Sequence, residues 1–274
     1  MNQEVSSKLY TPADLQAHRP LTLRTGAIIP LDKPLGWTSF DVVNKVRIMV
    51  RKVTGVKRIK VGHAGTLDPQ ATGVLVLCTG RATKLIEQLM DHDKEYRATL
   101  QLGATTPSFD SEHEIDATYP YEHITEEMVR SALHQFTGEI DQRPPTFSAV
   151  KVGGIRAYDL ARQGQEVELA HKRITIHELE LLSFTPPTLQ LRIVCSRGTY
   201  IRSLARDLGT VLSSGAYLTQ LVRTRSGEVS QADCFSLDQL DELLALTPEE
   251  EKLSRPFPLL YSLYPIRNRI QYAT

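Results

Sequence analysis

The sequence has no apolar stretch long enough to cross a membrane, and it begins without the charged segment and apolar run of an export signal. It contains only three cysteines, Cys78, Cys195 and Cys234, which are far apart and show no CxxC spacing. This scarcity argues against a disulfide framework and against a zinc site of the usual spacing. We therefore expect a soluble protein of a reducing compartment, the cytoplasm, that does not associate with membranes.

Net charge is also lacking, because 32 basic residues balance 32 acidic ones. Nucleic-acid-binding domains are often basic overall, so this balance counts against one. Phosphate affinity depends on local clustering of cations, however, and one segment is strongly basic. Its basic residues are Lys45, Arg47, Arg51, Lys52, Lys57, Arg58 and Lys60. They form either a solvated helix face or a phosphate-binding surface.

Recognisable cofactor motifs are missing as well. The sequence shows no Walker A loop, no dinucleotide-binding fingerprint and no metal-ligand motif. We expect no cofactor and no metal.

The pattern of the chain predicts an α+β fold. Its 274 residues, 41% of them apolar, suit one large domain with a small appendage. Strands are expected at 27–31, 74–78, 96–102, 189–195 and, as a pair, within 218–229. Helices are expected after Ser39 as the N-cap, at 82–90, 125–136 and 157–163, from about 199, and at 237–246. Strands and helices do not alternate as in regular βαβ units, which disfavours a doubly wound sheet.

The most informative segment is GHAGTLDPQATGVL, residues 62–75. It places Asp68 between glycine turns and directly before Pro69, which restricts Asp68 to an extended backbone. An isolated Asp-Pro is more often a plain turn. The density of glycine and the apolar strand that follows favour an active-site loop held on a rigid scaffold.

This segment resembles the catalytic-aspartate motif of the TruB/dyskerin family of pseudouridine synthases, and four further segments resemble other motifs of that family. They are LDKPLGWTS (31–39), KEYR (94–97), CSRGTYIRSL (195–204) and GAYLTQLVRTRSG (215–227). The motifs occur in the family's order across residues 31–227. Within the first motif, Lys33 and Ser39 are expected to shape and hold the turn.

The resemblance implies a pseudouridine synthase fold, with a mixed central sheet, flanking helices and a catalytic cleft. Residues 27–235 would form the catalytic domain, with an RNA-gripping insertion at about 104–165 that is weakly tied to the core. Residues 1–26 would be a flexible extension. Residues 236–274 would be a short helix and tail, too short for the RNA-binding PUA domain that family members often carry at this end.

The resemblance also assigns the site. Asp68 would be the nucleophile, and Arg202 would keep its carboxylate charged inside a cleft that excludes water. Tyr96 would be the platform for a uracil flipped out of its stack, and its hydroxyl could assist removal of the C5 proton. Without the motifs, the pattern favours a core tyrosine at Tyr96 and an ordinary surface arginine at Arg202.

Four other residues are expected to bind substrate. His63 would fill the space that the flipped base leaves, or stack on its neighbours, although a lone loop histidine is more often structural. Tyr200 and Leu221 would complete the pocket wall, and Lys84 would hold a phosphate.

The implied activity is isomerisation of uridine 55 in the T arm of tRNA, with the T stem-loop as substrate. We expect a monomer that needs no protein partner. One alternative is a tRNA-folding chaperone that uses the same cleft without catalysis, and another is a guide-dependent synthase in a ribonucleoprotein. An unrelated aspartate-dependent hydrolase would leave the other four motifs unexplained.

Overall fold

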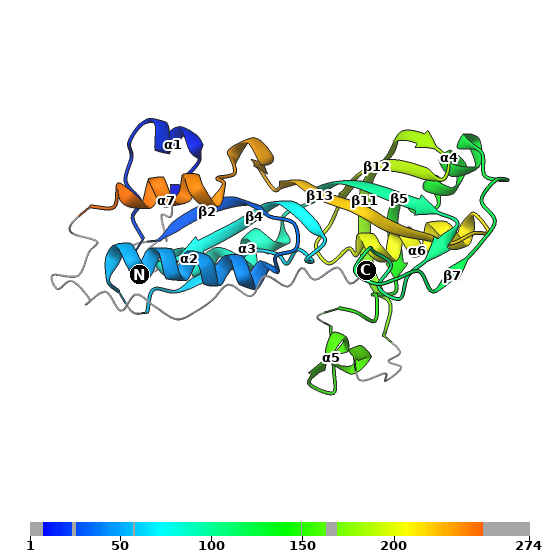
Figure 1. The fold of residues 1–274 in the computed structure, drawn as a ribbon, viewed down its shortest axis with the longest axis horizontal. Helices are drawn as coiled ribbons and strands as arrows, with labels where there is room; N and C mark the ends of the chain where they lie inside the picture. Colours follow the sequence, from blue (N-terminus) through cyan, green and yellow to red (C-terminus); the bar gives the residue numbers. More distant parts are fainter. Residues whose placement is uncertain (1–7, 24–25, 57, 149, 163–168, 249–274) are drawn as a thin grey trace, which may run out of the picture.

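The computed structural model describes residues 8–23, 26–56, 58–148, 150–162 and 169–248. Within them, ten strands form one mixed sheet in the order β1-β2-β4-β13-β5-β12-β11-β8, with β3 paired to β4 and β14 to β13 (Figure 1). The β1–β2 and β4–β13 pairs are parallel and the others antiparallel. The α+β class is confirmed.

The strands of this sheet are β1 (Lys8–Leu9), β2 (Ala27–Lys33), β3 (Val61–His63), β4 (Ala71–Thr79), β5 (Lys94–Leu102), β8 (Gly138–Gln142), β11 (Lys172–Thr185), β12 (Thr188–Cys195), β13 (Ala216–Ser226) and β14 (Val229–Ser230). The two small hairpins are β6 (Ala104–Thr105) with β7 (Ala117–Thr118), and β9 (Lys151–Val152) with β10 (Ile155–Arg156). The helices are α1 (Pro12–Gln16), α2 (Ser39–Thr54), α3 (Ile86–Asp91), α4 (Glu126–His134), α5 (Ala157–Arg162), α6 (Ile201–Val211) and α7 (Leu237–Ala245), with 3₁₀ turns at Gly80–Leu85 and Gln231–Asp233.

Strand β4 lies at the centre of the fold and is covered on both faces. Leu75 and Leu77 point into the larger apolar core, to which α2, α4, α6 and α7 contribute. Val74, Val76 and Cys78 point the other way, into a smaller core closed by the 3₁₀ turn at Gly80–Leu85 and α3. A strand buried on both faces needs an uninterrupted apolar run, which explains the sequence of this strand.

The amino-terminal segment differs from its prediction. Strand β1 pairs with β2, and α1 follows it. Tyr10, Leu21 and Leu23 are almost completely buried in the larger core. The prediction of a flexible extension is therefore wrong for residues 8–23, because these apolar side chains anchor the segment; positions 1–7 and 24–25 lie outside the described residues.

Part of the segment 104–165, predicted to be weakly tied to the core, is firmly packed on it. Strand β8 joins the main sheet through β11, and α4 packs on β11 and α6, so both belong to the body of the fold. The β9–β10 hairpin and α5 project from that body in Figure 1. Residues 163–165 of the predicted insertion lie outside the described part.

Two local predictions need correction. Thr38, not Ser39, caps α2: its side chain accepts a hydrogen bond from the Asp41 amide, and the Asp41 carboxylate accepts one from the Thr38 amide. The long strand β11 was not predicted. Its pairing with β12 shifts register twice, between Ile176 and Glu178 and between Leu181 and Ser183, which breaks the alternation that would have identified it.

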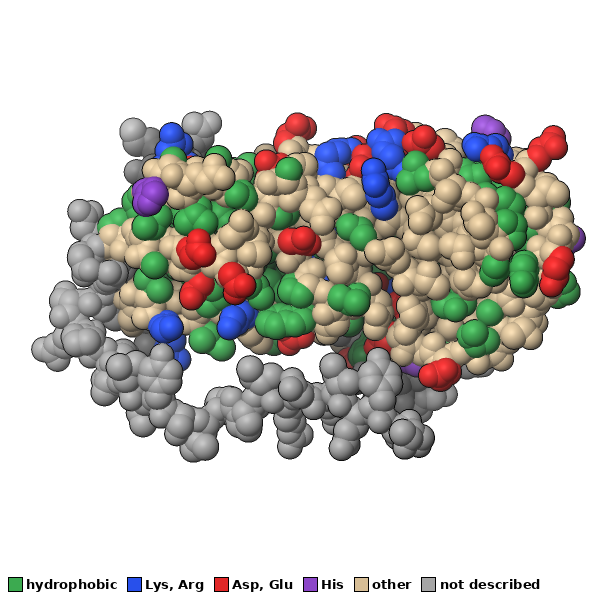
Figure 2. Space-filling view, turned by 45° about the horizontal axis from the view of Figure 1, so that its top comes forward, with side chains coloured by type: hydrophobic (Ala, Val, Ile, Leu, Met, Phe, Trp, Pro, Cys, Tyr) green, Lys and Arg blue, Asp and Glu red, His purple; other side chains and the backbone are tan. Residues whose placement is uncertain are grey.

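Two further features bear on the surface of the molecule. None of the helices in the described residues is long and apolar enough to cross a membrane. On the face shown in Figure 2, basic and acidic side chains stand next to one another along the upper edge, so the balanced charge is interspersed there.

Candidate active site

The loop between β3 and β4 carries Asp68, and the first motif holds this loop in place. The Ser39 hydroxyl accepts a hydrogen bond from the Leu67 amide at 2.8 Å and donates one to the Leu67 carbonyl at 3.0 Å. The Lys33 ammonium donates to the Pro34 and Trp37 carbonyls, at 2.9 and 2.5 Å, and to the Pro69 carbonyl at 3.3 Å. Lys33 therefore shapes its own turn, as predicted, and the two residues together fix the backbone on both sides of Asp68.

Arg223 on β13 binds the same loop from the other side. Its guanidinium donates to the carbonyls of Val74 at 2.7 Å, Gly65 at 3.1 Å and Thr66 at 3.4 Å, and the residue is only 1% exposed. Strands β4 and β13 approach so closely here that a β-carbon on Gly73, which has φ of +97°, would overlap the Arg223 carbonyl. Arg223 was not among the predicted site residues, although it stands two positions after Leu221 in the last motif.

Asp68 and Arg202 form the predicted ion pair. Arg202, in the first turn of α6, brings its Nε to 2.9 Å from a carboxylate oxygen of Asp68. The Arg202 side chain is 6% exposed and that of Asp68 is 37% exposed, so a fixed cation faces a carboxylate that remains open to a ligand. The other guanidinium nitrogens donate to the carbonyls of Ser108, at 3.1 Å, and Phe147, at 2.9 Å.

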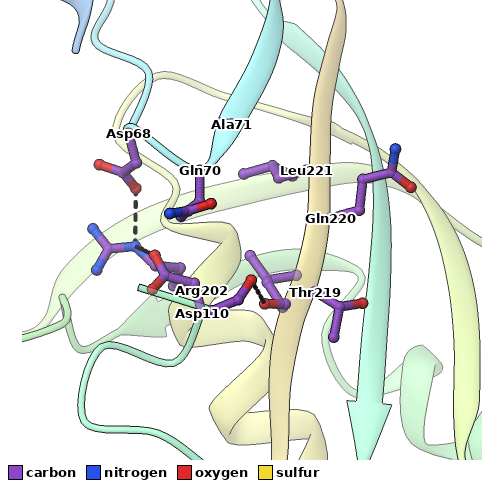
Figure 3. Close-up of a pocket in the computed structure, with 10 residues that line it drawn as sticks. Asp68, Gln70, Ala71, Asp110, Arg202, Thr219, Gln220 and Leu221 are labelled. Atoms are coloured by element: carbon purple, nitrogen blue, oxygen red, sulfur yellow. Dashed lines mark hydrogen bonds and ion pairs between the residues drawn. The ribbon is translucent and has the colours of Figure 1, made fainter. Parts of the chain in front are cut away.

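Asp110 is a second carboxylate at this arginine, and it was not predicted because it lies outside the five motifs. It is 3.6 Å from Arg202 Nε, and Figure 3 shows the guanidinium between Asp68 and Asp110. The Ser108 hydroxyl donates to the Asp110 carboxylate at 2.6 Å, and the Glu112 amide does so at 3.0 Å. In the described residues, Asp110, Glu112 and His113 place potential metal-ligand atoms within 4.8 Å of one another, but these contacts already engage the Asp110 carboxylate.

Asp68 and Arg202 open onto a cavity of about 310 Å³, within the size range of small-ligand sites. The predicted residues Tyr96, Tyr200 and Leu221 also line it. The structure thus brings together five of the seven predicted site residues, from the loop before β4 and from β5, α6 and β13.

The two tyrosines of this cavity have raised pKa values, with different neighbouring charges. Burial raises the pKa of Tyr96, and the Arg223 guanidinium against its hydroxyl opposes that rise. Burial, together with the Asp68 carboxylate, raises the pKa of Tyr200. The Gln142 side chain accepts from the Tyr200 amide at 2.8 Å and donates to its carbonyl at 3.1 Å, which fixes the start of α6.

The remaining two predicted residues lie outside this cavity. His63 is on β3, with a buried Nδ1 that has no hydrogen-bond partner in the described part of the chain, and burial and Arg223 lower its pKa. Lys84 lies in the 3₁₀ turn before α3 and lines a separate open depression. This depression and an adjoining one together form what we call the basic groove. Its cations are Arg47, Arg58, Lys60, Arg81 and Lys84.

Comparison with known proteins gives consistent matches. Residues 51–201 match the model for "TruB family pseudouridylate synthase (N terminal domain)", and residues 202–266 match "tRNA pseudouridylate synthase B C-terminal domain". The chain is 58% identical over 234 residues to "tRNA pseudouridine synthase B" of Phocaeicola vulgatus, covering 85% of this chain and all of the relative. It is 59% identical over 215 residues to the protein of the same name from Bacteroides fragilis, and the match covers 78% of this chain and 92% of that relative.

Solved structures show the same fold. A Cbf5–Nop10–Gar1 complex contains a chain with a TM-score of 0.62 and 27% identity, and the match covers 88% of this chain and 65% of that one. The fold and the sequence matches together define the protein as a pseudouridine synthase, an isomerase. More narrowly, the chain belongs to the TruB family of pseudouridylate synthases.

Proposed function

We propose that this enzyme converts uridine to pseudouridine in tRNA, at the T-arm uridine conventionally numbered 55, with Asp68 as the nucleophile. The observation that carries the proposal is the Asp68–Arg202 ion pair of 2.9 Å at the wall of the cavity. Relatives that are 58% and 59% identical are named tRNA pseudouridine synthase B, which supports tRNA as the substrate. The alternative of a synthase that acts within a larger assembly has weaker support, since the matching chain of the Cbf5–Nop10–Gar1 complex is only 27% identical.

The reaction breaks the N1–C1′ bond of uridine and forms a C5–C1′ bond. The proton on C5 is lost and N1 ends protonated, so no electrons are transferred overall. Asp68 supplies a carboxylate beside the sugar as the sugar becomes electron-poor, and the Arg202 guanidinium, held by its own hydrogen bonds, fixes where that carboxylate lies. This role explains why Arg202 is buried while the Asp68 carboxylate stays accessible.

The free-energy cost of extruding the target base must be offset by contacts inside the cavity. Unstacking costs a few kcal/mol, and stacking on an aromatic ring returns about 1–3 kcal/mol. Tyr96 supplies this ring, and Tyr200 and Leu221 close the wall. His63, next to the loop, takes the space that the base leaves in the T loop.

The basic groove provides the electrostatic attraction to the RNA backbone. None of its five cations forms an ion pair with an acidic side chain in the described residues. Groups of unpaired cations bind phosphate by releasing counterions, even in a protein whose net charge is zero. Charge reversal at Arg58 and Lys84 should therefore weaken tRNA binding and flatten its salt dependence.

The test is to incubate the protein with an unmodified tRNA transcript and to map pseudouridine by position. Wild type should modify uridine 55, and Asp68→Asn should lower the single-turnover rate by about a thousandfold or more while tRNA still binds. Asp116→Asn is the matched control, since Asp116 is exposed and, among the described residues, its carboxylate accepts a hydrogen bond from Thr105 alone. Full activity of Asp68→Asn would place the nucleophile elsewhere. A wild type that binds and refolds tRNA without forming pseudouridine would favour the chaperone alternative.

A further inference from the structure

The active cavity has an uneven distribution of charge. Its lining contains five basic side chains and a single carboxylate, that of Asp68. Arg202 is used by Asp68 and Asp110, and Lys94 and Arg223 are buried and bound to backbone carbonyls. The two others, Lys172 and Arg197, are exposed and so lie where the cavity meets solvent.

The two cations of this rim differ in their partners within the described residues. Arg197 is paired with Asp91 at 2.6 Å. Among the described residues, none forms a hydrogen bond or an ion pair with the Lys172 ammonium. Its neighbour Arg173 pairs with Glu139 at 3.4 Å and Asp141 at 3.1 Å, so within the described part of β11 the unpaired cation at its start is Lys172.

The Lys172 side chain lies against the turn that precedes α6. Gly198 in that turn has φ of +85°, and a β-carbon there would overlap the Lys172 ammonium. The positive φ favours glycine at this position, and the lysine ammonium lies close to its backbone.

The start of α6 adds to the positive potential at the same place. Its N-cap residue, Tyr200, makes no side-chain capping bond to the first-turn amides, and Ile201 in that turn lines the cavity. The amino-terminal end of a helix carries partial positive charge and favours anions. The Lys172 ammonium, the Gly198 turn and the helix start thus meet at one edge of the cavity.

We propose that Lys172 and the Gly198 turn form a phosphate subsite, which holds a phosphodiester flanking the uridine that enters the cavity. The inference rests on the proposed function, because an extruded nucleotide carries its own backbone to the edge of the cavity. The subsite keeps the sugar beside Asp68 while the base is detached. The five cations of the basic groove bind backbone farther from the target nucleotide.

The test measures binding of a synthetic T stem-loop in the Asp68→Asn background, so that no turnover occurs. Adding Lys172→Gln should weaken binding about fivefold and reduce the slope of log Kd against log salt concentration by about 0.7. Arg173→Gln is the matched control, because it makes the same charge change one residue further along β11, where the charge is already paired. It should bind like its parent.

A neutral linkage in the RNA then identifies the phosphate. Methylphosphonate on one side of the target uridine should weaken binding by the parent and by Arg173→Gln about fivefold, but should have little further effect on Lys172→Gln. The subsite does not exist if Lys172→Gln binds as tightly as its parent. It also does not exist if, at both flanking positions, the affinity lost through the methylphosphonate adds in full to the affinity lost through Lys172→Gln. Pseudouridine mapping with the wild type separately decides the proposed function, so the two failures are distinguishable.

Discussion

Replacing Arg223 by lysine keeps a positive charge but removes the several guanidinium N–H donors that hold the Asp68 loop. The guanidinium reaches three carbonyls, at Gly65, Thr66 and Val74, and the residue is 1% exposed. A lysine ammonium in the same place cannot present donors in all these directions. With about two buried carbonyls left unpaired, at about 1–3 kcal/mol each, Arg223→Lys should lower the free energy of unfolding by roughly 3 kcal/mol.

The same change should slow catalysis more than it weakens binding. Gly65 and Val74 lie on either side of Asp68, so the nucleophile shifts when these anchors are lost, and a misplacement of about 1 Å costs about a hundredfold in rate. Urea denaturation and single-turnover kinetics on a tRNA transcript measure the two effects, with Kd expected to change less than about twofold. Arg225→Lys is the control on the same strand, since Arg225 is partly exposed and donates to the Gly227 carbonyl. Wild-type stability and rate in Arg223→Lys would refute this reasoning.

Two further predictions concern buried titratable groups. Burial lowers the pKa of Lys33 from 10.5 to about 8. The unfolded chain therefore binds more protons than the folded one between these values, and stability should rise with pH across this window more steeply in wild type than in Lys33→Met. Parallel urea-unfolding curves would contradict this. Burial raises the pKa of Cys78, Cys195 and Cys234 to about 12, so Ellman's reagent at pH 8 should label none of them in the native protein and all three in urea. Labelling without denaturant would show that one of these thiols is accessible.

The sequence predicts the fold best where a single local preference, such as helix capping or an apolar run, determines the structure. The helix predicted at 125–136 is α4, with Thr125 as its N-cap. The apolar run at 74–78 is a central strand. Where two adjacent residues could serve the same rule, the prediction failed: Thr38 and Ser39 are both good caps, and only the tertiary contact of Ser39 with Leu67 decides which one caps α2.

Prediction of the site residues from the sequence was also incomplete. The motifs located Asp68, Tyr96, Tyr200, Arg202 and Leu221, which line one cavity. Periodicity does not reveal which buried cations bind backbone carbonyls, however, since those partners are amide groups that every residue carries. Arg223 and Lys94 were therefore missed as parts of the site, although both lie inside quoted motifs.

The spacing of the motifs along the chain has a common physical cause. Each motif outside the Asp68 loop reaches that loop or the cavity beside it: Lys33 and Ser39 from the first, Tyr96 from the third, Arg202 from the fourth and Arg223 from the fifth. A short loop rich in glycine cannot hold a charged nucleophile in a fixed position by itself. Here charged and hydroxyl groups from three separate segments bind its carbonyls, its amides and its carboxylate. A change in any one of them should therefore act on the position of Asp68, even where the substituted side chain never touches RNA.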